Sequence, residues 1–228
     1  MKKWLSLAML PLMYGPSATL YMRRKTSHRI TRKLHTTQTL YLTFDDGPHP
    51  YYTTKLLDLL KRYNAKATFF VVGTLAKKYP SIIERMHNEG HAIGIHHYTH
   101  QSAWLLTPHQ LAEQIERTRQ TIHEITGVHT HLYRPPWGHF NMATLAVAKH
   151  DDIVLWSHIF KDWKVQGNHL HLLKHPIADG SILLLHDNGD TKGADSSAPR
   201  CMLQALEPLL ATATQQFLAL PGEDHECY

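Results

Sequence analysis

The chain has very little cysteine, only Cys201 and Cys227, and both lie near its C-terminus. Two thiols exclude a disulfide framework and a cysteine-based metal knuckle, although an exported protein could join this pair in one disulfide. Beyond residue 40 the sequence also lacks internal repeats, low-complexity tracts and linkers. A length of 228 residues therefore indicates one folded domain with a sizeable core.

The first 44 residues contain no acidic side chain, although they hold eight of the 24 Lys and Arg residues. The other 16 basic residues stand beside 19 acidic ones, so the overall charge of +5 arises in an N-terminal arm. A protein that tracks a phosphate backbone needs a basic surface on its folded part. Nucleic acid is therefore not expected as a partner, and no protein partner is predicted.

Residues 4–22 form an apolar stretch behind Lys2 and Lys3. Three interpretations are open: a signal peptide with small residues near Ser17 and Ala18, an uncleaved anchor, or a loosely packed arm. A helix of about 19 residues is roughly long enough to span a bilayer. We expect export to the cell envelope, with the protein either secreted or associated with the membrane through residues 4–22.

Short β-rich runs alternate with helical runs from residue 39 onward. Strands are predicted at residues 39–44, 67–72, 92–95, 131–133, 153–157, 182–186 and 217–220, and helices at 54–63, 80–88, 107–126 and 202–211. The third helix has the clearest start, because Thr107, Pro108 and Gln110 form a capping box, and Gly127 marks its end. Strands separated by such helices favour repeated βα units and a parallel sheet or barrel.

Polar side chains suited to hydrolysis stand where several predicted strands end. In parallel α/β folds the carboxyl ends of the strands share one edge, where functional residues gather. The residues are Asp45, Asp46, His96, His100, Arg134 and His186. Adjacent carboxylates at the end of an apolar strand repel each other and lose solvation unless a cation or a proton compensates. A capping role for one of them is the alternative.

The spacing His96-x-x-x-His100 places two imidazoles on one face if the segment forms a helical turn. With one carboxylate they make a set of three ligands and leave a position open for water, as catalytic zinc sites do. His97 is expected to point away from this site. A chance spacing of four is common among 20 histidines, and His169, His171 and His175, which include another such step, are expected to be surface or helix residues.

Together these segments resemble the polysaccharide deacetylase family, also known as carbohydrate esterase family 4 or the NodB-homology domain. The resemblance covers residues 39 to 221, and it is carried by the segments TFDDGP at 43–48, HHYTH at 96–100, RPPWG at 134–138, DW at 162–163 and LLH at 184–186. It implies an α/β fold, a distorted (β/α) barrel with fewer than eight regular units. The expected organisation is a basic arm at 1–38, a catalytic domain at 39–221 and a tail at 222–228.

The resemblance also implies a chemistry for five residues. Asp46, His96 and His100 would bind a divalent metal, which lowers the pKa of a bound water and polarises the acetyl carbonyl. Zn²⁺ is the expected ion, while Co²⁺, Ni²⁺ and Mn²⁺ also suit this ligand set. Asp45 would be the general base, and His186 would be the general acid that protonates the leaving amine.

Five further residues take supporting roles by the same resemblance. Arg134 would orient Asp45, and Asp162 would support His186. The backbone N–H of Trp137 would help to hold the developing oxyanion. Trp163 and Leu184 would line the pocket for the acetyl methyl group.

This sequence departs from the family pattern at a few positions. His97 and Ile95 stand where the second motif usually has Ser or Thr and Asn, Trp137 replaces the usual Tyr or Phe, and Ile159 replaces a frequent acidic residue. The expected activity is removal of N-acetyl groups from N-acetylglucosamine-type polymers, either peptidoglycan or chitin-like glycans. Three alternatives remain: an O-acetyl xylan esterase, a deacylase of lipid-linked sugars, and a non-catalytic glycan-binding envelope protein.

Overall fold

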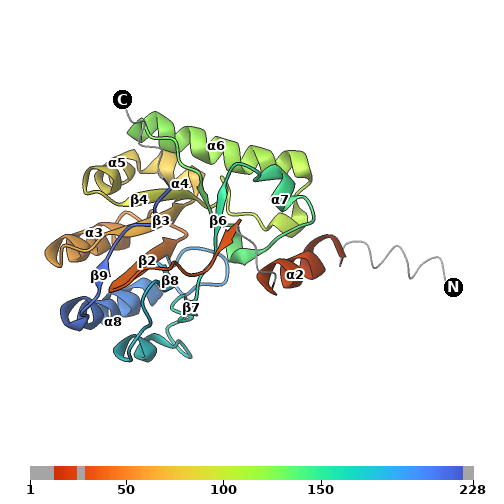
Figure 1. The fold of residues 1–228 in the computed structure, drawn as a ribbon. Helices are drawn as coiled ribbons and strands as arrows, with labels where there is room; N and C mark the ends of the chain where they lie inside the picture. The colour runs from red at the N-terminus through yellow and green to blue at the C-terminus, as the bar shows by residue number, and fades with distance from the viewer. Residues whose placement is uncertain (1–12, 25–28, 223–228) are drawn as a thin grey trace.

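The computed structural model describes residues 13–24 and 29–222, and its strands form one parallel sheet surrounded by helices (Figure 1). The strands are β1 Ile30–Thr31, β2 Thr39–Asp45, β3 Ala67–Val71, β4 Ala92–Ile95, β5 Leu132–Tyr133, β6 Asp152–Val154, β7 His158–Ile159, β8 Ile182–His186 and β9 Gln216–Phe217. The α-helices are α2 Ala18–Arg24, α3 Tyr52–Arg62, α4 Gly73–Lys78, α5 Pro80–Asn88, α6 Pro108–Thr126, α7 Thr144–Val147 and α8 Ala198–Thr212.

The sheet curls into a ring because one segment pairs at both of its ends. The strand order is β1-β6-β5-β4-β3-β2-β8-β7, with β9 beside β2. Residues 152–159 begin as β6, which pairs with β5, and end as β7, which pairs with β8. The ring of β2, β3, β4, β5, this bent segment and β8 is a distorted (β/α) barrel with fewer than eight regular units, which confirms the predicted fold class.

The central strands form because their sequences are apolar and rich in β-branched and aromatic residues. Every residue of β2, β3 and β4 is buried, as expected for parallel strands covered on both faces. Phe44 of β2 stacks on Phe69 of β3, with ring centroids 5.4 Å apart. This core fixes the strand register, and the register determines which side chains reach the carboxyl edge.

Most predicted elements are present, and α6 has the predicted ends. Thr107 and Gln110 form the capping box, and Gly127 ends the helix in the left-handed conformation at φ 76°. The predicted strand 153–157 is shorter, because the chain bends after Val154 so that Ser157 N donates to Ile182 O. Helix α8 starts four residues before the predicted position and continues through Pro208.

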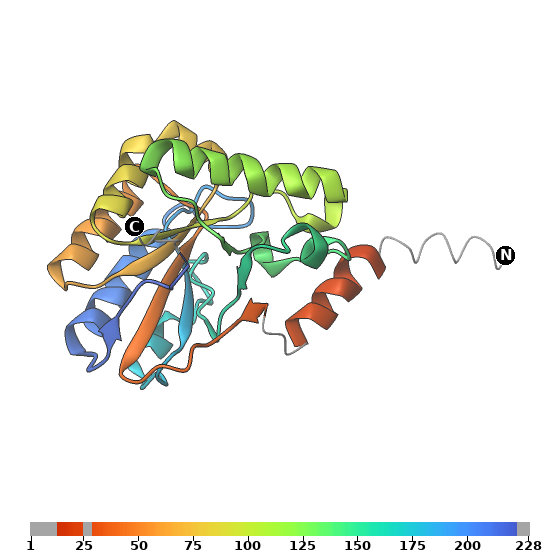
Figure 2. The same cartoon turned by 45° about the horizontal axis from the view of Figure 1, so that its top comes forward.

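Residues 13–24 pack against the barrel, next to the segment that contains α7 (Figure 2). A π-helical turn at Met13–Ser17 leads directly into α2. Within the two described ranges, no helix has the length and apolar character needed to cross a membrane. Residues 4–12, about half of the predicted signal or anchor segment, lie outside the described residues, whereas residues 13–22 lie within them. The division at residue 38 therefore stays a prediction.

Candidate active site

The polar residues predicted at the strand ends lie at one edge of the barrel. β2 ends with Asp45, which is in register with His186 at the end of β8. Asp46 follows in the left-handed conformation, at φ 76°, and this turns its carboxylate back toward the strands. His96 and Arg134 follow directly after β4 and β5. The predicted convergence of these side chains is confirmed.

Asp46, His96 and His100 form a group whose ligand atoms all lie within 4.8 Å of one another. Asp46 Oδ1 lies 3.3 Å from His96 Nε2 and 2.9 Å from His100 Nε2. Burial alone raises the pKa of Asp46, but its close contacts with His100 and His96 and the charges of His100 and His186 hold that pKa well below its usual range. A carboxylate that stays ionised beside two imidazole nitrogens is a donor set suited to a divalent cation.

The groups around this set fix its orientation. His96 Nδ1 lies 2.7 Å from the carbonyl oxygen of Arg134, so Nδ1 carries the proton and Nε2 presents its lone pair to the site. Thr191 donates to Asp46 Oδ2 at 2.8 Å, and Asn188 donates to the Asp46 carbonyl at 3.0 Å. The residues present therefore fit a metal through both their donor atoms and their supporting hydrogen bonds.

His96 and His100 do not share a helical turn. The segment between them is a loop, in which His97 and His100 have φ values of 62° and 52°. His97 points away from the site, as predicted: Nδ1 contacts the Gln101 carbonyl and Nε2 contacts the Tyr133 hydroxyl, each at 2.7 Å. These two contacts hold the loop in place and bring the two ligand histidines together.

Asp45 is held by an arginine that is completely buried. Arg134 Nη1 donates to Asp45 Oδ1 at 2.7 Å and to Thr43 at 2.8 Å, and its other nitrogens donate to the carbonyls of Val154 and Leu155. With its guanidinium fixed on all sides, Arg134 gives Asp45 a single orientation. Asp45 Oδ2 is left 3.8 Å from His96 Nε2, so it faces the proposed metal.

His186 and Asp162 form a second charged pair across the site from Asp45. Nδ1 of His186 lies 2.9 Å from Asp162 Oδ1, and the His186 amide donates to Oδ2 at 2.6 Å. Burial lowers the pKa of His186, but the charge and hydrogen bond of Asp162, together with Asp46 and Asp45, raise it to about 9. The carboxylates around the ring therefore favour its protonated form, in which Nε2 is the nitrogen left to donate.

A cavity of about 390 Å³ opens over these groups. Trp137, Trp163 and Leu184, the three residues predicted to contact substrate, all line it. Trp137 is 40% exposed, and its ring lies 4.4 Å from that of His100. Trp163 meets His186 edge to face, with centroids 5.2 Å apart. Aromatic walls around a polar floor suit the apolar faces and polar edges of a sugar.

Residues 32–156 match the family model described as polysaccharide deacetylase, which is more than half of the chain. The chain belongs to the polysaccharide deacetylase family.

Named relatives agree with this assignment. The chain is 35% identical over 187 residues to a peptidoglycan-N-acetylglucosamine deacetylase of Bacillus cereus, covering 79% of this chain and 66% of the relative. It is 38% identical over 160 residues to the peptidoglycan-N-acetylmuramic acid deacetylase PdaA of Bacillus subtilis, covering 65% and 60%. It thus spans less than two-thirds of each relative. A crystal structure of a peptidoglycan N-acetylglucosamine deacetylase superposes with a TM-score of 0.72 at 31% identity, covering 84% and 90%.

This polysaccharide deacetylase family member has site residues that sequence reasoning missed. Arg23, Trp156, Thr191 and Lys192 also line the cavity. Trp156 lies in the bend between β6 and β7, and Thr191 and Lys192 lie in the loop after β8. None of them carries a local pattern that marks it, and Arg23 was interpreted as part of the basic arm.

Asp187 is a further missed residue, directly after β8. Burial and the charge of Asp46 raise its pKa to about 7 in spite of a hydrogen bond from Thr53. Gly47 passes so close that an added Cβ would lie 2.4 Å from the Asp187 carboxylate, so glycine is required there. Asp187 thus packs directly against the backbone that follows Asp46.

The remaining histidine and cysteine expectations concern other parts of the chain. His169 and His175 flank a short 3₁₀-helix at Leu170–Lys174 that contains His171, and both His171 and His175 are exposed, as predicted. Among the described residues, no other group of three or more His, Cys, Asp or Glu side chains lies close enough to hold a metal ion than Asp46, His96 and His100. Cys201 is partly buried in α8, while Cys227 lies outside the described residues, so their pairing stays a prediction.

Proposed function

We propose that this protein is a metal-dependent deacetylase that removes N-acetyl groups from N-acetylglucosamine-type polymers. The observation that carries this proposal is a three-residue ligand set with a carboxylate held by arginine on one side and a histidine held by aspartate on the other. A nucleophile-activating base and an acid for the leaving group thus flank one position for the scissile amide.

The proposed metal ligands are Asp46, His96 and His100. When bound there, a divalent metal supplies Lewis-acid chemistry, lowering the pKa of a water and polarising the acetyl carbonyl. Two imidazole nitrogens and one carboxylate oxygen suit Zn²⁺ first, and also Co²⁺, Ni²⁺ or Mn²⁺.

Asp45 takes the proton from the attacking water, and the hydrogen bond from Arg134 keeps its carboxylate in place. His186 then gives its Nε2 proton to the leaving amine, so that a neutral amine departs. Asp162 supports this step in two ways: it keeps Nδ1 protonated, so that Nε2 is the nitrogen that donates, and it raises the pKa of the ring.

Trp137 supplies a backbone N–H to the oxyanion that forms on the acetyl carbonyl. Among the described residues this amide has no hydrogen-bond acceptor of its own, so it is available for such a role. Trp163 and Leu184 surround the acetyl methyl group at the base of the cavity. The named relatives act on peptidoglycan, which supports peptidoglycan as the first substrate and the cell envelope as the location.

The test is acetate release from N-acetylglucosamine oligomers and from peptidoglycan, with the full chain freed of metal by a chelator and then supplied with zinc. We expect release that requires zinc. Acetylated xylan and an N-acylated lipid-linked sugar serve as comparison substrates. Release from xylan alone would replace the amide substrate with an ester.

A chain that retains one zinc and binds glycans but releases no acetate from any of these substrates would contradict the proposed catalysis. That outcome would favour the glycan-binding alternative. A chain that neither retains zinc nor releases acetate would contradict the metal site as well.

A further inference from the structure

Helix α2 contributes a side chain to the wall of the catalytic cavity. Arg23, at the C-terminal end of α2, lines that cavity together with Trp137 and Trp156. Its Nη2 donates to the carbonyl of Trp137, and its Nε donates to the carbonyl of Gly138 at 3.3 Å. The guanidinium carbon lies 5.8 Å from the centroid of the Trp156 ring. One cation thus connects the arm, the Trp137 loop and the cavity wall.

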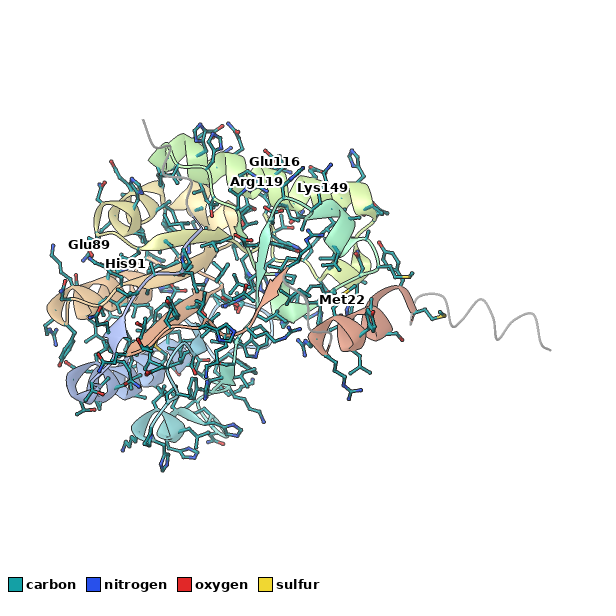
Figure 3. All side chains as sticks on the ribbon, in the orientation of Figure 1. Met22, Glu89, His91, Glu116, Arg119 and Lys149 are labelled. Atoms are coloured by element: carbon teal, nitrogen blue, oxygen red, sulfur yellow. The ribbon has the colours of Figure 1, made fainter. Side chains whose placement is uncertain are left out.

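The rest of α2 is fixed to the same loop, so Arg23 does not act from a loose arm. The buried hydroxyl of Thr19 donates to the Phe140 carbonyl at 2.9 Å and accepts from the Phe140 amide at 2.8 Å. The indole of Trp104 also donates to this hydroxyl, at 2.8 Å. Met22, labelled in Figure 3, packs against the hydrophobic core, and its carbonyl accepts from Arg32 at 2.6 Å.

The turn before α2 makes further contacts with the barrel. Tyr14 donates through its hydroxyl to the Leu106 carbonyl at 2.8 Å, and its own carbonyl accepts from the Met142 amide at 3.0 Å. Gly15 lies against the Trp104 ring so closely that an added Cβ would stand 2.7 Å from it. Residues 14–23 therefore contact the barrel along the length of the 136–142 segment.

The part of the loop that Arg23 holds is the part whose conformation is least favourable. Trp137 has a φ of 55°, in the left-handed region that a bulky residue seldom adopts, and Gly138 follows at 60°. Such a conformation is unfavourable for a bulky residue and persists where the surroundings fix it. Arg23 binds the carbonyls of these two residues, and so fixes the orientation of both peptide groups.

We propose that Arg23 is a positioning residue for catalysis, which holds the Trp137–Gly138 backbone so that the Trp137 N–H points at the reacting carbonyl. This inference rests on the proposed deacetylase function. If it is correct, α2 contributes a residue that catalysis requires, although α2 lies in the basic arm. Arginine suits the role because its planar donors reach two carbonyls at once, whereas a lysine offers one ammonium group.

The experiment compares the full chain with three variants: Arg23→Ala, Arg23→Lys and Arg24→Ala. Arg24 is the matched control, because it is the exposed neighbour at the end of the same helix. The measurements are kcat and KM for N-acetylglucosamine oligomers, zinc content, and hydrogen exchange of peptides that cover residues 134–142.

We expect Arg23→Ala to lower kcat by about 10- to 100-fold with KM changed by less than about 2-fold, because a misplaced oxyanion donor acts on the transition state. Zinc content should stay at one per chain, and residues 134–142 should exchange faster. Arg23→Lys should recover part of kcat, and Arg24→Ala should match the wild type.

Two results would overturn the inference in an active enzyme. One is a wild-type kcat in Arg23→Ala, and the other is a raised KM with an unchanged kcat, which would make Arg23 a substrate contact instead. If the wild type itself releases no acetate, the proposed function is wrong, and Arg23 then has no catalytic role either. In that case faster exchange in Arg23→Ala than in Arg24→Ala shows only that Arg23 holds the loop.

Discussion

Replacing Asp162 with asparagine separates the protonation of His186 from its position. Burial lowers the pKa of His186, and Asp162 is the strongest of the groups that raise it, ahead of Asp46 and Asp45. The resulting rise from 6.5 to about 9 corresponds to about 3 kcal/mol in favour of the protonated ring. A bound cation offsets the contributions of Asp46 and Asp45 but leaves that of Asp162, so the direction of the effect is the same in the metal-loaded enzyme.

The sign of the expected effect follows from the role of His186 as an acid. A raised pKa keeps the ring protonated to higher pH, so losing Asp162 removes activity from the alkaline side first. In the metal-free site, a return of the pKa from about 9 to 6.5 would lower the protonated fraction about 30-fold at pH 8 and by less than about 2-fold at pH 6. The loss in kcat of Asp162→Asn should therefore grow with pH.

The assay is zinc-dependent acetate release at saturating substrate between pH 5.5 and 9.5. Asp152→Asn is the control, because Asp152 is an exposed carboxylate at the start of β6. Zinc content is measured in parallel, so that metal loss is not mistaken for loss of the acid. A loss of equal size at every pH would refute the reasoning, since it would mean that Asp162 positions His186 without setting its protonation.

Two further substitutions test stability. Arg134→Met leaves the buried carboxylate of Asp45 without its arginine partner. It should lower the free energy of unfolding, measured with urea, by about 3 to 5 kcal/mol. Adding Asp45→Asn to this variant should restore part of the lost stability. His97→Ala leaves the Tyr133 hydroxyl and the Gln101 carbonyl without their partner. It should lower the free energy of unfolding by about 1 to 3 kcal/mol and weaken zinc binding. An unchanged zinc affinity would contradict the role of His97 in holding the ligand loop.

The strand ends of the site were predictable because they follow from local sequence. An apolar run that stops at Asp45 and Asp46 marks both a buried strand and its polar end, and parallel strands bring such ends together. The capping signals of α6 are similarly local, which explains why its ends match the prediction. Paired polar groups such as Arg134 and Asp45 became recognisable only through the family resemblance, since 89 residues separate them.

What the sequence did not reveal depends on contacts between distant segments. The four-residue spacing of His96 and His100 is compatible with a helical turn or a loop, and the contacts of His97 with Gln101 and Tyr133 stabilise the loop. Arg23 resembles any other basic residue in the arm, because its bond to the Trp137 carbonyl spans 114 residues. Composition and periodicity carry no information about such contacts.

The measurement that tests the central claim most directly is a zinc titration of the metal-free chain, with bound zinc and acetate release followed together. For the wild type we predict that activity rises in proportion to bound zinc and stops rising at one zinc per chain. Asp46→Ala should bind zinc at least about 10-fold more weakly and stay inactive at one equivalent. Activity without zinc, or an Asp46→Ala variant that recovers at one equivalent like the wild type, would contradict the account.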